Sequence, residues 1–455
     1  MSNSNTLLMT EGNIYKIIIR FAIPIFISNV FQQLYNTVDS AVVGAIEGTE
    51  AIASVGTTAP IINLLVGLFL GVATGCSAVI ARHFGSKNGK RLEDCVHTGI
   101  AVGLVGGTIL MIIGIIGAKW LLILIKSPND TLDLSTLYLR IYFIGMIPMI
   151  LYNMGAGILQ GVGDSKRPLI YLSIGGVANI ILDLLFVAVF RWSVAGVAIA
   201  TVLAQLVSTT LVLYKLLHTN DVYKLSLKQI KFHKTELKDI LKFGIPAGLQ
   251  SAFFAISNLL IQGFINDFGS KVMAGQTAYS KIDGFLYMPT SAFGITTMTF
   301  VSQNISVNNI KRAKKGTNIA LLLSVLTTLA LVVIVLIVGK PLIALFTKGD
   351  ETAIKYGVIM MYCMAPFTVI YAFIEVFSGF VKAAGATTEA MVITGSTICV
   401  FRVVYLLFMF YVLGIKSIYV IFSAYPVSWI LCLIVYLIYY LSNGWQKYLF
   451  KHKPN

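Results

Sequence analysis

Charged side chains are scarce in this sequence of 455 residues, because Asp, Glu, Lys and Arg make up only 12% of it. Soluble domains carry about 25% charged residues. Apolar residues reach 57%, and the mean hydropathy is +0.84. This composition excludes a soluble enzyme, and it excludes a disordered chain, which would need low hydrophobicity. The sequence is that of an integral membrane protein, with room for roughly twelve spans of ~20 residues.

Motifs for catalysis, nucleotide binding and metal binding are also missing. No GxxxxGK[ST], HExxH or GxSxG motif occurs. The five cysteines are scattered and form no CxxC pair, so neither a disulfide framework nor a zinc site is implied. We therefore expect no enzymatic activity and no prosthetic cofactor. Any active transport would have to draw its energy from an ion gradient.

Long uncharged stretches define most of the predicted membrane spans. Eight stretches lack any charged side chain: 51–81, 99–118, 141–163, 192–214, 243–266, 284–310, 316–339 and 417–446. Four more reach spanning length with one ionisable residue inside: 21–44 with Asp39, 168–190 with Asp183, 356–381 with Glu375 and 388–415 with Arg402. The sequence therefore predicts an all-α membrane protein with twelve transmembrane helices.

The distribution of Lys and Arg predicts the orientation. The net charge of +15 would suggest nucleic acid in a soluble protein, but here the basic residues lie in short segments between apolar runs. With the N-terminus in the cytoplasm, inside segments carry 23 of the 34 Lys and Arg, outside segments carry 10, and Arg402 lies within a span. This bias favours cytoplasmic termini. No nucleic-acid partner is expected.

The two halves of the chain resemble each other when shifted by about 222 residues. The matching positions are Phe21-Ala-Ile-Pro24 with Phe243-Gly-Ile-Pro246, Asn36 with Asn258, Asn88-x-Lys90-Arg91 with Asn309-x-Lys311-Arg312, and Gly157 and Gly163 with Gly379 and Gly385. We predict an N-terminal six-helix lobe over 1–222, a basic cytoplasmic linker over 223–240 and a C-terminal six-helix lobe over 241–455. Parallel repeats of this kind are typical of secondary transporters, so a 6+6 arrangement around a central cavity is expected.

Two aspartates lie inside predicted spans of the first half. Asp39 follows Gln32 and Asn36 at a spacing that places all three side chains on one helical face. Asp183 follows Asn179 by four residues, so this pair shares a face as well. Charges are costly in hydrocarbon and nearby carboxylates raise each other's pKa, which a proton or a hard cation would relieve. We interpret the aspartates as a coupling-ion site; the alternative is that each is a hydrogen-bonded structural residue or lies at a helix end that the span prediction misplaces.

Ionisable and amide side chains of the second half leave two interpretations open. Glu375 and Arg402 could form a structural salt bridge with each other, or either could face the substrate cavity. Asn258 and Gln262, four residues apart in the seventh span, either join neighbouring helices or line the transport path.

Four motifs together point to a known family. They are Phe21-x-x-Pro24 at the first span, Asn36-x-x-Asp39 followed by Gly44, Gln160-Gly-Val-Gly163-Asp164-Ser after the fourth span, and Asn179-Ile-Ile-Leu-Asp183 in the fifth. With twelve helices in two sets of six, the chain resembles the multidrug and toxic compound extrusion (MATE) transporters from about residue 10 to residue 447.

The resemblance implies particular site residues. Asp39, Asn179, Asp183 and Thr201 fall on the family's N-lobe cation site, and the first three would bind Na⁺ if transport is sodium-coupled. The acidic pair that other members use in the seventh and tenth spans is not matched, which favours the N-lobe branch. Residues expected to line the substrate cavity or to gate it are Asn36, Pro24, Gln32, Asn153, Asn258, Gln262, Glu375 and Arg402.

The resemblance also implies a function. The chain would export cationic or amphipathic organic compounds in exchange for Na⁺ or H⁺, as a monomer in the bacterial cytoplasmic membrane. Small organic substrates and the lipid bilayer would be its partners. A flippase for lipid-linked oligosaccharide is the alternative within the wider superfamily, but it should carry several basic residues in its cavity. A membrane-embedded enzyme or receptor is a third reading, and it lacks a catalytic motif.

Overall fold

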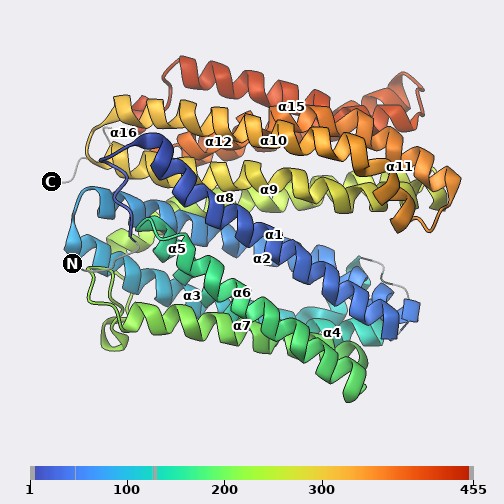
Figure 1. The fold of residues 1–455 in the computed structure, drawn as a ribbon, viewed down its shortest axis with the longest axis horizontal. Helices are drawn as coiled ribbons and strands as arrows, with labels where there is room; N and C mark the ends of the chain where they lie inside the picture. The colour runs from blue at the N-terminus through green and yellow to red at the C-terminus, as the bar shows by residue number, and fades with distance from the viewer. Residues whose placement is uncertain (1–5, 47, 126, 128–130, 450–455) are drawn as a thin grey trace. The chain divides into compact units, whose positions relative to one another are not determined.

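The computed structural model describes residues 6–46, 48–125, 127 and 131–449, without the side chains of residues 35–53. The described residues form helices and no strand, which confirms the predicted all-α fold (Figure 1). The helices up to the middle of the chain are α1 Ile14–Ile46, α2 Gly48–Gly85, α3 Gly89–Leu124, α4 Leu132–Ile144, α5 Met146–Gly161, α6 Lys166–Asp183, the π-helix η1 Leu184–Val189 and α7 Ser193–Leu217.

The second part of the chain is helical in the same way, and several of its spans are interrupted. It contains η2 Leu227–Gln229, α8 Lys234–Asn266, α9 Ser270–Ser306, α10 Ile310–Phe346, α11 Glu351–Met364, η3 Ala365–Phe367, α12 Thr368–Ala384, α13 Thr387–Thr394, η4 Gly395–Val400, α14 Phe401–Leu407, η5 Phe408–Val412, α15 Ile418–Leu441 and α16 Gln446–Leu449.

Apolar length accounts for eleven of the twelve predicted spans. Among the described residues, ten helical segments are long and apolar enough to cross a membrane, and α4 with α5 makes an eleventh that bends by 47°. The helical segment that contains the predicted stretch 141–163 is therefore longer than predicted, and it is not one straight helix. Pro148 has no backbone N–H and its ring clashes with the carbonyl four residues earlier, at Ile144, where α4 ends.

The twelfth span is α9, which is long but too polar to meet the same criterion. It packs against α10, α11 and α12, and most hydroxyl side chains of its second half, among them Thr290, Thr296 and Ser302, are buried. Thr296 and Thr297 donate to the carbonyls of Ala292 and Phe293 at 2.7 and 2.8 Å. These bonds satisfy the hydroxyls within the helix itself, so a polar helix can be buried by its neighbours.

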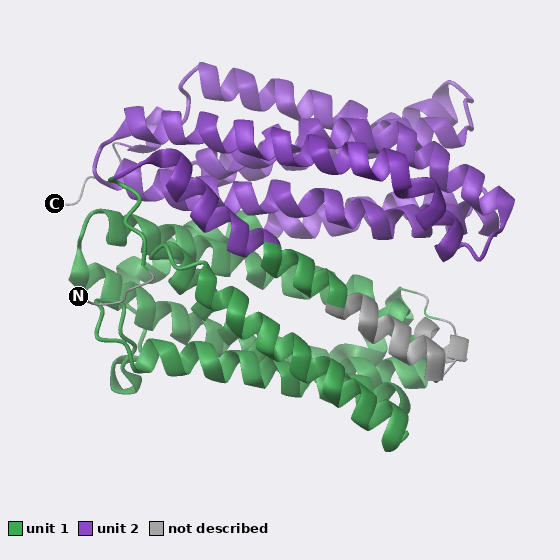
Figure 2. Cartoon of the chain, in the orientation of Figure 1, with its two compact units in different colours: residues 1–11, 27–248 green, residues 12–26, 249–455 purple. Residues whose placement is uncertain are grey.

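The described helices divide into two compact units (Figure 2). Unit 1 consists of 1–11 and 27–248, and unit 2 consists of 12–26 and 249–455. The divisions fall inside α1 and α8, a few residues after Pro24 and Pro246. The lobes predicted at 1–222 and 241–455 remain a prediction.

Local structure repeats between the units at the predicted shift. The Asn88 side chain caps α3 by accepting from Arg91 N at 3.3 Å, and the Asn309 side chain caps α10 by accepting from Arg312 N at 3.1 Å. The residues just before them are left-handed, with φ of 55° and 57°. Gly163 and Gly385 are also left-handed and lie 222 residues apart, so the repeat in sequence is a repeat of structure.

Glycines hold the first part of α8 against α2 within unit 1. A Cβ at Gly75 would come within 2.5 Å of Gly244 N, and a Cβ at Gly244 would come within 2.6 Å of the Cα of Val72. One turn along, a Cβ at Gly248 would overlap the carbonyl oxygen of Leu68. Small residues allow helix backbones to approach this closely in a membrane.

Candidate functional site

Helices α6 and α7 carry three of the four residues of the predicted ion site and lie side by side in unit 1 (Figure 1). Gly175 of α6 allows the close approach, because a Cβ there would overlap Oγ of Ser208 on α7. That hydroxyl donates to the carbonyl of Tyr171 on α6 at 3.1 Å. A glycine and an interhelical hydrogen bond therefore fix the two helices to each other.

Asp183 and Asn179 are buried at the end of α6, with exposed fractions of 0% and 1%. Their four-residue spacing places both side chains on one face of the helix. α6 ends at Asp183, and the chain continues as the π-helix η1. Helical segments of this type are rare and are frequent at functional sites. The carboxylate thus lies at the point where the helical geometry changes.

An apolar cluster covers η1. It consists of Tyr138, Val187, Val194, Val197 and Ala198, all buried. Val187 belongs to η1 itself, and the next three belong to the beginning of α7. Asp183 directly precedes η1, and burial disfavours the charged form of a carboxylate.

A small cavity lies between α6 and α7. Its space of about 10 Å³ is close to what one water molecule needs. It is lined by Leu172, Gly175, Gly176 and Asn179 of α6 and by Thr201, Ala204, Gln205 and Ser208 of α7. The structure therefore brings Asn179 and Thr201, two predicted ion-site residues, to one cavity. It adds Gln205 and Ser208, which the sequence did not single out.

Amide atoms that border this cavity are buried and have no hydrogen-bond partner among the described residues. Among the described residues, neither Oδ1 nor Nδ2 of Asn179 has a hydrogen-bond partner, and neither does Oε1 of Gln205. Thr201 Oγ1 donates to the carbonyl of Val197 at 3.0 Å. Most buried polar groups are hydrogen-bonded, so such atoms call for a bound ligand or water.

Residues of the first span are only partly described. The backbone of α1 passes continuously through Pro24, and the Pro24 side chain is partly buried. Gln32 is exposed. The side chains of Asn36 and Asp39 lie outside the described residues, so their part in the site remains a prediction.

Arg402 is buried in unit 2 but does not pair with Glu375. Its exposed fraction is 2%, its Nε donates to Ser428 Oγ at 3.0 Å, and its guanidinium lies 4.4 Å from the ring centre of Tyr425. Within the described part of the chain no ion pair joins Arg402 to Glu375, so the suggested salt bridge is wrong. A hydroxyl and an aromatic face stabilise the charge in its place.

Asp283 is a buried carboxylate that the sequence reasoning missed. It lies in α9, is 9% exposed and accepts a hydrogen bond from the hydroxyl of Tyr279 at 2.9 Å. The predicted stretch began at residue 284 because charged residues were used as its borders. The continuous helix from Ser270 shows that Asp283 lies well inside α9.

The remaining polar candidates have varied surroundings. Glu375 is partly buried, and its Oε2 lies 3.0 Å from where a Cβ on Gly294 would be. Gln262 of α8 accepts from Gln276 of α9 at 3.1 Å, which supports its interpretation as an amide joining neighbouring helices. Asn153 donates to the carbonyl of Met149 at 2.8 Å, and Asn258 is exposed.

The segment between α7 and α8 is docked on unit 1 rather than extended. Ser226 N donates to Nε2 of His97 at 2.9 Å, and His233 N donates to Thr98 Oγ1 at 3.1 Å. Tyr223 in this segment is buried, and burial raises its pKa to about 12. The predicted linker is therefore an ordered part of the structure.

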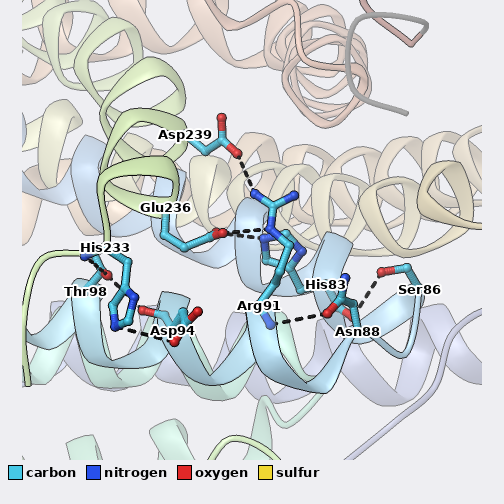
Figure 3. Close-up of polar contacts among 9 residues, drawn as sticks. All are labelled: His83, Ser86, Asn88, Arg91, Asp94, Thr98, His233, Glu236 and Asp239. Carbon is cyan, nitrogen blue, oxygen red and sulfur yellow. Dashed lines mark hydrogen bonds and ion pairs between the residues drawn. The ribbon is translucent and has the colours of Figure 1, made fainter. Parts of the chain in front are cut away.

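A polar clamp continues this contact at the beginning of α8 (Figure 3). The Glu236 carboxylate, 3% exposed, accepts from Arg91 Nε and faces His83 Nε2, each at 2.8 Å. Asp239 faces the same arginine at 3.4 Å, and His233 faces Asp94 at 3.4 Å. The clamp joins α8 to α2 and α3 through charges, next to the glycine contact described above.

Sequence relatives of the chain are multidrug transporters by name. It is 27% identical to the probable multidrug resistance protein YpnP of Bacillus subtilis over 390 residues, covering 84% of this chain and 86% of that protein. It is 22% identical to the multidrug export protein MepA of Staphylococcus saprophyticus, covering 82% and 83% of the two chains.

Solved structures share the fold, and the family's sequence pattern occurs twice. An outward-facing multidrug resistance MATE family transporter of the MOP superfamily superposes with a TM-score of 0.90 at 22% identity, covering 97% of this chain and 98% of that one. The MatE family pattern matches residues 24–185 and again 246–408. The two matches begin 222 residues apart, which is the shift that aligned the halves. The chain is therefore a multi-pass membrane protein of the MatE family, the MATE transporters.

Proposed function

We propose that this protein exports organic compounds from the cell in exchange for Na⁺ or H⁺, with Asp183 as a residue that binds the coupling ion. One observation carries the proposal: a fully buried carboxylate and an unpartnered buried amide share a helical face, and the amide lines a small cavity. A carboxylate charge at this depth in a membrane protein is costly, so the site favours a bound cation or proton.

The relatives support the substrate class. YpnP and MepA are described as multidrug resistance and multidrug export proteins, and they match most of this chain. We extend that activity to this protein, with cationic or amphipathic organic compounds as substrates. It acts as a transporter and not as an enzyme, needs no prosthetic cofactor and works as a monomer.

Coupling follows from the electrostatics of the site. Without an ion, Asp183 and the predicted second carboxylate, Asp39, repel each other in an apolar environment. A proton or a cation removes the repulsion, and Asn179 and Thr201 supply neutral oxygens beside it. If substrate favours the ion-free conformation, ion and substrate exclude each other, and one moves out as the other moves in.

Orientation and location complete the proposal. The Lys and Arg bias favours a cytoplasmic location, in a bacterial cell, for both termini and the 223–240 linker. The flippase alternative is less favoured, because Arg402, the basic residue within a predicted span, already binds Ser428 and Tyr425. A diphosphate would need free basic groups.

Neutralising the carboxylates tests the proposal. Asp183→Asn and Asp39→Asn should each reduce gradient-driven efflux of a cationic dye from proteoliposomes by at least tenfold, because an amide cannot bind a proton or balance a cation. Asp133→Asn is the matched control, since the Asp133 side chain is 94% exposed. Thermal unfolding in detergent checks that each variant folds. Efflux by folded Asp183→Asn at the wild-type rate would show that this residue does not bind the coupling ion.

A further inference from the structure

Gln205 lies in α7 on the face that borders α6. It follows Thr201 by four residues and precedes Ser208 by three, so all three side chains project from the same helical face. All three line the small cavity, opposite Asn179 of α6. The polar face of α7 therefore extends past Thr201 and away from Asp183 by a further two turns.

The amide oxygen of Gln205 is a buried acceptor without a partner. Its Oε1 has no hydrogen bond among the described residues, and neither does Oδ1 of Asn179, which lines the same cavity. An unsatisfied buried polar group destabilises the folded protein. Two such oxygens lie on facing helices around a space of about 10 Å³. One ligand that contacts both oxygens would satisfy both acceptors.

The hydroxyls of the cavity are also acceptors. Thr201 Oγ1 donates its proton to the carbonyl of Val197, and Ser208 Oγ donates to the carbonyl of Tyr171. With the protons used in this way, the lone pairs of both oxygens remain for a ligand. The lining thus offers four neutral oxygens, the donor type that suits a hard cation and that Na⁺ sites of transporters employ.

We propose that Gln205 is a ligand of the coupling ion and that this ion is Na⁺. The inference rests on the proposed function and goes further, because neutral amide and hydroxyl oxygens stabilise a sodium ion but do not take up a proton at neutral pH. Asn179 shares a helical face with Asp183 and lines the same cavity as Gln205. The ion therefore contacts α7 at two successive turns, at Thr201 and at Gln205.

Sodium binding to the purified protein in detergent tests the assignment. Gln205→Met preserves the length of the side chain and removes its oxygen, so the apparent Kd for ²²Na⁺ should rise about tenfold, the equivalent of 1.4 kcal/mol. Asp183→Asn should lose measurable binding. Thr210→Val, on the exposed face of the same helix, should bind like the wild type.

A second variant keeps the test decisive if Gln205→Met does not fold. Gln205→Glu retains an oxygen at the same position and adds a charge, so it should bind ²²Na⁺ at least as tightly as the wild type above pH 8.

Wild-type affinity in folded Gln205→Met, with binding lost in Asp183→Asn, would assign the cavity to water. That result would overturn the inference while leaving the proposed function intact. Dye efflux driven by pH gradients alone, with no Na⁺ binding to the wild type, would overturn it too. Efflux insensitive to either gradient would instead overturn the proposed function.

Discussion

Arg402 and Asn179 are both buried polar side chains within spans, but their surroundings differ. Arg402 donates to Ser428 and stacks on Tyr425, so its charge is accommodated by fixed protein groups. Asn179 has no partner among the described residues and borders a cavity. The contrast supports the proposed ligand-binding role of Asn179 and favours a structural role for Arg402.

Replacing Arg402 tests its structural role. Lysine cannot reproduce a guanidinium that stacks on a ring while donating from Nε, so Arg402→Lys should destabilise the protein by about 1–2 kcal/mol. The measurement is the midpoint of thermal unfolding in detergent. Arg140→Lys, at an exposed arginine, should leave the midpoint unchanged. An unchanged midpoint with lost efflux in Arg402→Lys would mean that the arginine acts in transport.

Part of the candidate site could be predicted from the sequence, and the rest depends on packing that the sequence does not reveal. Asp183 stood out because a carboxylate interrupts an apolar run, and Asn179 stood out by its spacing from it. Gln205 carries no charge, and its significance depends on burial without a partner, which only the packing of α6 on α7 reveals. Asp283 was missed because a charge served as the border of a predicted span.

At the scale of whole helices, the glycine contact between α2 and α8 gives a sharp prediction. A Cβ at Gly248 would overlap the Leu68 carbonyl, so Gly248→Ala should destabilise unit 1 by about 1–3 kcal/mol. Gly263→Ala, in the same helix with no atom within 4 Å, should be neutral or slightly stabilising. The measurement is the midpoint of thermal unfolding of both variants. Equal midpoints would contradict a stabilising role for the close packing of α8 on α2.

The positions of the helices were predictable, and their irregularities were not. Uncharged runs located the spans because hydrocarbon excludes charge. The 47° bend beside Pro148 and the 3₁₀ turn at Pro366 follow from prolines, but most prolines here lie inside continuous helices, such as Pro24 and Pro246. The π-helical segments η1, η4 and η5 carry no sequence signal that periodicity would detect.

At the scale of the whole molecule, the orientation in the membrane is the first testable consequence. In intact cells, a membrane-impermeant maleimide should not label Lys228→Cys, since the Lys and Arg bias predicts a cytoplasmic location for the 223–240 linker. Asp133→Cys, in the exposed first turn of α4, should be labelled from outside. Labelling at 228 with none at 133 would invert the predicted topology.

The proposed exchange would be a property of the whole molecule, because it requires ion and substrate to compete through one conformational equilibrium. A coupling free energy of about 1–3 kcal/mol between the two ligands is typical, and linkage requires each to weaken the binding of the other by the same factor. Transport by exchange therefore has two measurable directions. An ion gradient should drive the substrate, and a substrate gradient should drive the ion.

Reciprocal flux in proteoliposomes tests the central claim most directly. A Na⁺ or pH gradient directed against a loaded cationic dye should accelerate dye efflux, and a dye gradient imposed without an ion gradient should drive ²²Na⁺ or H⁺ in the opposite direction. Both fluxes should disappear in Asp183→Asn. Dye movement at one rate under every gradient, with no opposite ion flux, would contradict exchange through this site.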